Sequence, residues 1–164
     1  MSLPTFRRQA TLFLKGQDFV EEIRNRFNPE QARLIAPHVT LCREDEILDW
    51  EDVASNLRDL NPKTVTLRFG YPERDGNLLL LPVEGPTSDF VRLRELILNT
   101  QSTVVRKHEP HITLIHPRNG LCSDSIFHSV VSDFCPFIYT FDEVSFIEQT
   151  NGDGWNVTTK FSLT

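Results

Sequence analysis

Two histidines in this chain are each followed, two positions later, by a threonine. The pairs are His38 with Thr40 and His111 with Thr113, and each stands in a Pro-His-(Val or Ile)-Thr-Leu sequence. Because side chains alternate between the faces of a strand, both members of a pair point to one side. Imidazoles exchange protons near neutral pH, and hydroxyls donate hydrogen bonds to anions. Two such pairs around one groove would supply a base, an acid and two neutral donors, which suffices to cleave a phosphodiester without a metal ion.

One His-x-Thr sequence alone is weak evidence, because it would most simply be a structural pair. Here both copies end a similar module of strand, helix and strand, which favours a shared function. A histidine pair that only terminates two duplicated strands is the alternative. The expected elements are a strand at 8–14, a helix at 18–27 capped by Asp18 and a strand at 34–42, then a strand at 77–83, a helix at 86–99 and a strand at 109–115.

Each module is followed by a further helix and strand. No linker or low-complexity tract separates the halves, so we predict one α+β domain over 1–164 with an internal duplication at approximately 1–76 and 77–164. We expect mostly antiparallel sheets with the helices packed outside them. The remaining elements are helices at 50–60 and 123–134, a strand at 63–69 that forms a hairpin with 78–83, and a strand at 137–147 that pairs with 155–161 across the turn at 151–154.

The bulk composition limits the possible ligands. The chain has 164 residues, a net charge of −6 and a pI near 5.3, which weigh against a protein that grips a long nucleic acid duplex through many phosphates. A small basic pocket in an acidic shell is still compatible with these values. We therefore expect a short nucleotide, or an RNA held only at its end, and no membrane, since no apolar run approaches the length of a membrane span.

The cysteines indicate a reducing compartment. Cys42, Cys122 and Cys135 are odd in number and lack the Cys-x-x-Cys spacing of a zinc site, so we expect free thiols. The first residues also lack the extended apolar segment of a signal peptide. These features predict a cytoplasmic protein, which we expect to be a monomer.

The two motifs, at 37–41 and 110–114, and the duplicated layout over nearly the whole chain resemble the 2H phosphoesterase superfamily. This group includes bacterial RNA 2′,3′-cyclic phosphodiesterases, also called 2′-5′ RNA ligases, and plant cyclic phosphodiesterases. The resemblance implies two pseudo-symmetric lobes that flank a central groove, with one motif from each lobe. It also implies an RNA-processing enzyme that acts on a 2′,3′-cyclic phosphate or a 2′-5′ linkage.

Residue chemistry suggests how such a site would work. A neutral histidine takes a proton from the attacking water and a protonated one donates to the departing ribose oxygen, while Thr40 and Thr113 hold the phosphate oxygens. We assign His38 as the base and His111 as the acid, although the pseudo-symmetry makes the roles exchangeable. No cofactor or metal is expected, because catalytic zinc usually has three protein ligands and each motif offers one.

Three residues after the motifs are possible substrate contacts. Arg43 and His116 each lie five positions after a motif histidine, and Arg118 follows soon after. Some members of the superfamily have an arginine at this offset after the second motif, where it contacts the phosphate end of the substrate. This chain has His116 there, so the correspondence is incomplete, and solvated charges at strand ends are the alternative.

Three functions other than hydrolysis stay open at this point. A non-catalytic module could bind a nucleotide or an RNA end through the same four side chains. A reversible 2′-5′ RNA ligase would use the same groups in the opposite direction. A structural protein with a fortuitous repeat would have no affinity for phosphate.

Overall fold

The computed structural model describes residues 3–101 and 105–164, and its largest element is a seven-stranded antiparallel sheet. The strand order is β4-β5-β6-β2-β1-β8-β9, and β3 and β7 form a separate two-stranded sheet. The strands are β1 (Phe6–Phe13), β2 (His38–Cys42), β3 (Val65–Phe69), β4 (Glu73–Asp75), β5 (Leu78–Pro82), β6 (His111–Ile115), β7 (Phe137–Phe141), β8 (Glu143–Thr150) and β9 (Asn156–Ser162). The helices are α1 (Asp18–Phe27), α2 (Pro29–Leu34), α3 (Trp50–Asp59), α4 (Ser88–Leu98) and α5 (Asp124–Asp133).

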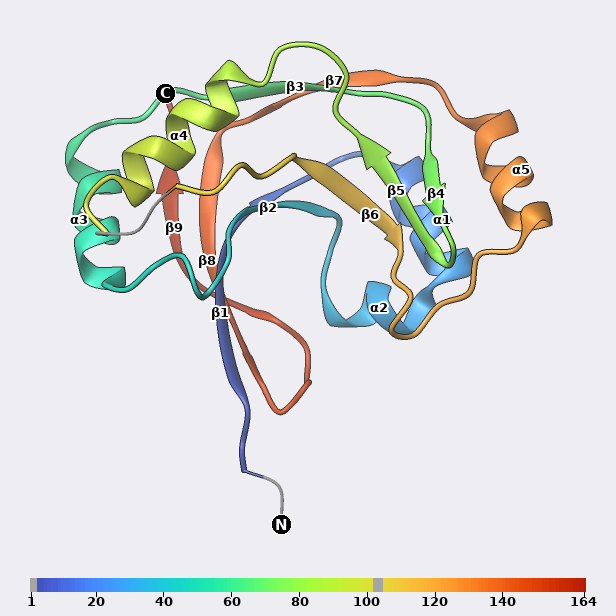
Figure 1. The fold of residues 1–164 in the computed structure, drawn as a ribbon, viewed down its shortest axis with the longest axis horizontal. Coiled ribbons are helices and arrows are strands. Elements are labelled where there is room, and N and C mark those ends of the chain that lie inside the picture. The colour runs from blue at the N-terminus through green and yellow to red at the C-terminus, as the bar shows by residue number, and fades with distance from the viewer. Residues whose placement is uncertain (1–2, 102–104) are drawn as a thin grey trace.

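The two motif strands lie together in the middle of the molecule. β2 and β6 pair where Val39 faces Ile112, with β1, β8 and β9 on one side and β4 and β5 on the other (Figure 1). Each motif strand also pairs with the first strand of its own module: Phe13 faces His38, and Pro82 faces His111. The equal registers place the two histidines at corresponding positions on either side of the centre.

Burial explains which way the motif side chains point. Val39 and Leu41 are buried in the hydrophobic core, and Ile112 and Leu114 are their counterparts in β6. The histidines and threonines between them are only partly buried, because they lie on the opposite face of the sheet. The apolar alternation in the sequence therefore directs the polar groups of both motifs to one side.

The helix between the two strands of each module packs against the motif strand of the other module. α1, from the first module, contacts β6, and α4, from the second module, contacts β2. Figure 1 shows α3 and α4 at one end of the molecule and α1 and α5 at the other. The predicted α+β class, mostly antiparallel with helices outside the sheets, is confirmed.

The predicted hairpin between 63–69 and 78–83 is wrong. β3 pairs along its length with β7, whereas β5 forms its hairpin with β4 across a turn at Gly76, whose φ of 58° suits glycine. β3 and β5 meet only at a single bridge between Phe69 and Val83. The predicted turn at 72–76 is also largely wrong, because Glu73–Asp75 form β4 and only Gly76 of this stretch lies in the turn.

Three boundaries also differ from expectation. Asn28-Pro29 ends α1 as predicted, but Pro29 then occupies the first turn of α2, so the strand begins at His38 and not at position 34. Asp18 is the first residue of α1 and not its cap, since Gln17 holds that position. The stretch 137–147 divides at Asp142 into β7 and β8, which belong to different sheets. The predicted pairing with the last strand is confirmed for β8 and β9.

Within 3–101 and 105–164, none of the helices is both long and apolar enough to cross a membrane.

Candidate active site

A groove of about 200 Å³ contains the four motif side chains, which β2 and β6 place on its floor. All seven residues that the sequence singled out line it, so the distant motifs and the residues after them share one site. Its lining consists of Arg7, Gln9, Arg24, Gln31, Ile35, His38, Thr40, Arg43, His108, His111, Thr113, His116, Arg118 and Trp155.

Both motif histidines are held by the same backbone contact. Nδ1 of His38 lies 2.8 Å from the carbonyl oxygen of Ala36, and Nδ1 of His111 lies 3.0 Å from that of Glu109. A carbonyl oxygen can only accept, so each Nδ1 carries the proton and donates it. The neutral ring therefore presents an unprotonated Nε2 as its free nitrogen, which is the tautomer a general base requires.

The environment of His38 favours its neutral form. The pKa of His38 is lowered to about 4, mainly by burial and also by the nearby charges of Arg24 and His111, against the opposing hydrogen bond to Ala36. At neutral pH this imidazole is uncharged. Its ring also meets the edge of Phe13, with the centroids 6.1 Å apart.

The hydroxyl of Thr40 has an oriented neighbour. Nε2 of Gln9, on β1, donates to Oγ1 of Thr40 at 3.1 Å and to Oγ1 of Thr11 at 2.9 Å. Because the Thr40 oxygen accepts this bond, its own hydrogen is free to point toward a ligand oxygen. Gln9 thus prepares Thr40 as a donor.

A turn after β6 brings His116 and Arg118 into the groove. The side chain of Asn28 accepts a hydrogen bond from the backbone N–H of His116 at 2.9 Å, and Nδ1 of His116 accepts from the backbone N–H of Arg118 at 3.0 Å. Strict strand alternation would turn His116 away, but the chain leaves the strand at Ile115. Burial, and then the charge of Arg118, lower the pKa of His116.

The groove is cationic although the whole chain is acidic. Four arginines and four histidines line it, and none of its lining residues is a carboxylate. Of the arginines, Arg7 pairs with Glu44 at 3.1 Å and also lies over the ring of Trp155 at 5.3 Å. Such a surface attracts anions and leaves the histidines as the proton-transferring groups.

Sequence reasoning missed several members of this site. Gln9, Arg24 and Trp155 carry no motif, and His108 was not singled out. His108 donates from Nε2 to the carbonyl oxygen of Thr40 at 3.0 Å, which ties the approach to β6 onto β2. The only feature of the sequence that could have placed His108 in the site was its position three residues before His111.

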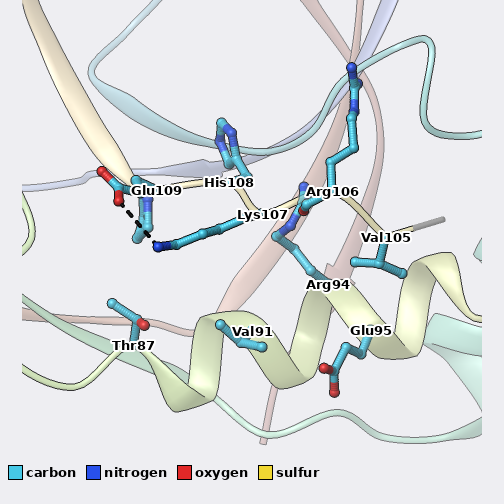
Figure 2. A pocket seen from close by; sticks show the side chains of 10 residues that line it. Thr87, Val91, Arg94, Glu95, Val105, Arg106, Lys107, His108 and Glu109 are labelled. Atoms are coloured by element: carbon cyan, nitrogen blue, oxygen red, sulfur yellow. Dashed lines mark hydrogen bonds and ion pairs between the residues drawn. The ribbon is translucent and has the colours of Figure 1, made fainter.

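A larger cavity, of about 500 Å³, lies between α4 and the segment 105–110 (Figure 2). His108 lines both cavities, but neither motif histidine lines this one. Its walls carry both signs of charge, and Lys107 and Glu109 pair across 3.7 Å. Mixed charge and the lack of a proton-transferring pair make it a poorer candidate for catalysis than the groove.

Cys42 is fully buried next to the motif, and burial raises the pKa of its thiol to about 12. A thiol in that state is a packing group and not a nucleophile. Across the described ranges, we find no cluster of three or more histidine, cysteine, aspartate or glutamate side chains arranged to hold a metal ion.

No protein-family model and no curated protein matches the chain. Several solved structures do match the chain. Escherichia coli LigT without ligand superposes with a TM-score of 0.63 at 16% identity, covering 99% of both chains. The chain has the LigT fold. TT0787 of Thermus thermophilus matches with a TM-score of 0.56 at 16% identity, over 96% of this chain and 97% of that one. A structure described as a phosphoesterase matches at 0.60 and 15% identity, covering 98% and 99%. The resemblance to the 2H phosphoesterases therefore holds at the level of the fold.

Proposed function

We propose that this protein is a metal-independent phosphodiesterase that hydrolyses a 2′,3′-cyclic phosphate or a 2′-5′ linked nucleotide or RNA end. One observation carries the proposal: two histidines with the same bond from Nδ1 to a carbonyl oxygen lie in one cationic groove that no carboxylate lines. Two titratable rings of fixed orientation are what acid–base cleavage of a phosphodiester needs.

In this mechanism, Nε2 of His38 accepts a proton from the water that attacks phosphorus. The bond between phosphorus and one ribose oxygen breaks, and protonated His111 gives its Nε2 proton to that oxygen. The result is a phosphate monoester and a free hydroxyl. The hydroxyls of Thr40 and Thr113 hydrogen-bond the non-bridging oxygens, where charge grows in the transition state.

The lowered pKa of His38 supports its assignment as the base. A ring whose pKa lies near 4 is uncharged at neutral pH and can act as a base without first losing a proton. In a 2′-5′ ligation of two RNA ends, a 5′-hydroxyl would attack the 2′,3′-cyclic phosphate in place of water and the 3′ oxygen would leave, so the reaction would use the same four side chains. Structures of LigT were solved with 3′-AMP, NADP+, ATP and phosphate, and nucleotide phosphates are accordingly the first ligands to test here.

The proposal is tested with a panel of 2′,3′-cyclic, 3′,5′-cyclic and 2′-5′ linked nucleotides in the presence of a chelator. We expect turnover of the first or third class, and a loss of about 10²–10⁴-fold in each of His38→Ala and His111→Ala. Retention of most activity in the double variant would contradict the mechanism. Tight phosphate binding without turnover of any substrate would instead indicate a binding module.

A further inference from the structure

Arg24 is a buried cation without a carboxylate partner. It lies on α1 with a relative exposure of 3%, and its Nη1 donates to the carbonyl oxygen of Ile35 at 2.9 Å. Among the residues that the structure describes, Arg24 forms no ion pair with a carboxylate. Burial lowers the pKa of Arg24 to about 10, against the opposing effect of the Glu21 charge on the same helix, so the group is still charged at neutral pH. A buried charge of this kind is costly unless something compensates it.

The second module contains a matched case in which the charge is compensated. Arg94, on the crossover helix α4, is also 3% exposed, and its Nη2 lies 2.7 Å from Oε2 of the buried Glu46. Arg94 also donates to the carbonyl oxygen of Arg106, which leads into β6, much as Arg24 donates to that of Ile35, which leads into β2. The two arginines therefore support the same part of their modules, but of the two only Arg94 forms an ion pair with a carboxylate among the described residues.

The free side of Arg24 faces the groove. Arg24 lines the groove with His38, whereas Arg94 does not. Its Nε and Nη2 have no hydrogen-bond partner in the described part of the chain, yet no side-chain nitrogen there is both sealed from solvent and unsatisfied. These nitrogens are thus open to a ligand. Glu21, on the same helix, only partly offsets the burial of Arg24. Since no carboxylate lines the groove, an anion that contacts these nitrogens from the groove has to be a ligand.

We propose that Arg24 binds a phosphate group of the substrate at the His38 end of the groove. This inference rests on the proposed function, because it assigns a further binding residue to the same site. The ligand phosphate occupies the electrostatic role that Glu46 has beside Arg94. A guanidinium offers paired N–H groups that match two phosphate oxygens, and so a lysine would replace it only in part.

The first test measures binding without turnover. Inorganic phosphate is titrated into the wild type, Arg24→Gln, Arg24→Lys and Arg26→Gln, and followed by calorimetry. Arg26 is the matched control, since it lies on the same helix and is exposed. We expect the dissociation constant to rise about tenfold in Arg24→Gln, less in Arg24→Lys, and not at all in Arg26→Gln. Wild-type affinity in a folded Arg24→Gln variant overturns the inference.

If Arg24→Gln does not fold, a measurement on the wild type still tests the contact between Arg24 and phosphate. The Nε–H resonance of Arg24, assigned by its absence from the spectrum of Arg24→Lys, is followed as phosphate is added. A saturable shift supports the contact, and an unchanged resonance at saturation overturns it. Neither readout needs catalysis, so a protein without turnover would disprove the proposed function and leave this inference separately tested.

The kinetic arm compares a nucleoside 2′,3′-cyclic phosphate with and without a 5′-phosphate. A rise in KM for both substrates in the Arg24 variants supports contact with the scissile phosphate. A rise only for the 5′-phosphorylated substrate supports contact with the neighbouring phosphate. Unchanged KM for both would overturn the inference.

Discussion

At the scale of single residues, His38 and His111 occupy equivalent positions in the two modules. The backbone contacts of the two histidines are equivalent, but the pKa of His38 is lowered to about 4 by burial and by the charge of Arg24. The acid limb of kcat/KM belongs to the group that must be deprotonated in the free enzyme. We expect that limb near pH 4, measured with a cyclic nucleotide across pH 3–8. A limb near the unperturbed histidine value of about 6.5 would instead indicate an ordinary environment for the base.

The same shift predicts a dependence of stability on pH. His38 has a lower pKa in the folded chain than in the unfolded chain, so the unfolded state binds more protons between about pH 6.5 and 4. The free energy of unfolding should therefore fall as pH drops through this window, by a few kcal/mol in all. Urea denaturation at a series of pH values measures it, with His38→Gln as the comparison. An equal slope in that variant would show that other groups carry the effect.

Gln9 offers a test of how Thr40 is oriented. Replacing Gln9 with Leu removes the N–H that occupies the Thr40 oxygen, and we expect kcat to fall about tenfold as the hydroxyl loses its direction. The change should have little effect in a Thr40→Val background, which a double-mutant cycle measures. Additive losses would show that Gln9 acts elsewhere.

These residues also mark how far the sequence predicts the site. His38, Thr40, His111 and Thr113 follow from strand alternation, which is a local property. Arg24 does not, because its sequence position is typical of the solvated face of an amphipathic helix. Its burial depends on how α1 docks against the segment at Ile35.

At the scale of elements, the Arg94–Glu46 pair fastens α4 to the end of β2. Arg94 also donates to the carbonyl oxygens of Leu41 and Arg106, at 2.6 and 2.9 Å. In Arg94→Met the buried Glu46 carboxylate keeps only the backbone N–H of Arg43 at 2.9 Å and the more distant Arg106 at 4.0 Å, so the free energy of unfolding should fall by about 3 kcal/mol. Arg92→Met, on the exposed side of the same helix, should change it by less than about 1 kcal/mol.

The double variant Arg94→Met, Glu46→Met separates charge from packing. Because it removes both charges at once, we expect it to be more stable than Arg94→Met alone, as measured by urea denaturation. A double variant less stable than the single one would mean that the hydrogen bonds to the backbone dominate.

The turn after His116 packs tightly around Gly120, which leaves no room for a side chain there. A Cβ there would come within 2.7 Å of Ile115 Cγ2 and 2.9 Å of the Asn28 side chain, whose oxygen holds the backbone N–H of His116. Gly120→Ala should therefore cost about 1–3 kcal/mol in unfolding free energy and raise KM. Gly154→Ala is the control, since its nearest contact is 3.8 Å away. Equal effects of the two changes would argue against a tight turn.

Element boundaries were predictable to within one residue where apolar periodicity was long, as in α3 and α5. They were missed where a proline both ends and begins a helix, as Pro29 does at the junction of α1 and α2. The hairpin partner of β5 was predicted wrongly because β4 lies inside the turn-rich stretch 72–76, so the whole stretch resembled a turn that joins β3 to β5. Only the tertiary pairing of β3 with β7 decides between them.

At the scale of the whole molecule, charge is unevenly distributed. A chain of net charge −6 encloses a groove that is lined by four arginines and no carboxylate. Attraction to the substrate should therefore act mainly at short range and be screened by salt, with a Debye length of about 10 Å at 0.1 M. We expect KM for a cyclic nucleotide to rise between 50 and 500 mM salt while kcat changes little. A KM that is independent of salt would contradict a binding step dominated by charge.

The position of β1 has a consequence for biosynthesis. β1 precedes the other described strands in the chain, yet it lies between β2 and β8, and β2 pairs with β6 as well as with β1. The pairing of β1 with β2 can form as soon as both strands have been made, whereas the pairings of β1 with β8 and of β2 with β6 need strands of the second module. The nascent protein therefore exposes incompletely paired strands for most of its translation, and its folding should be slow and vulnerable to aggregation until β8 emerges.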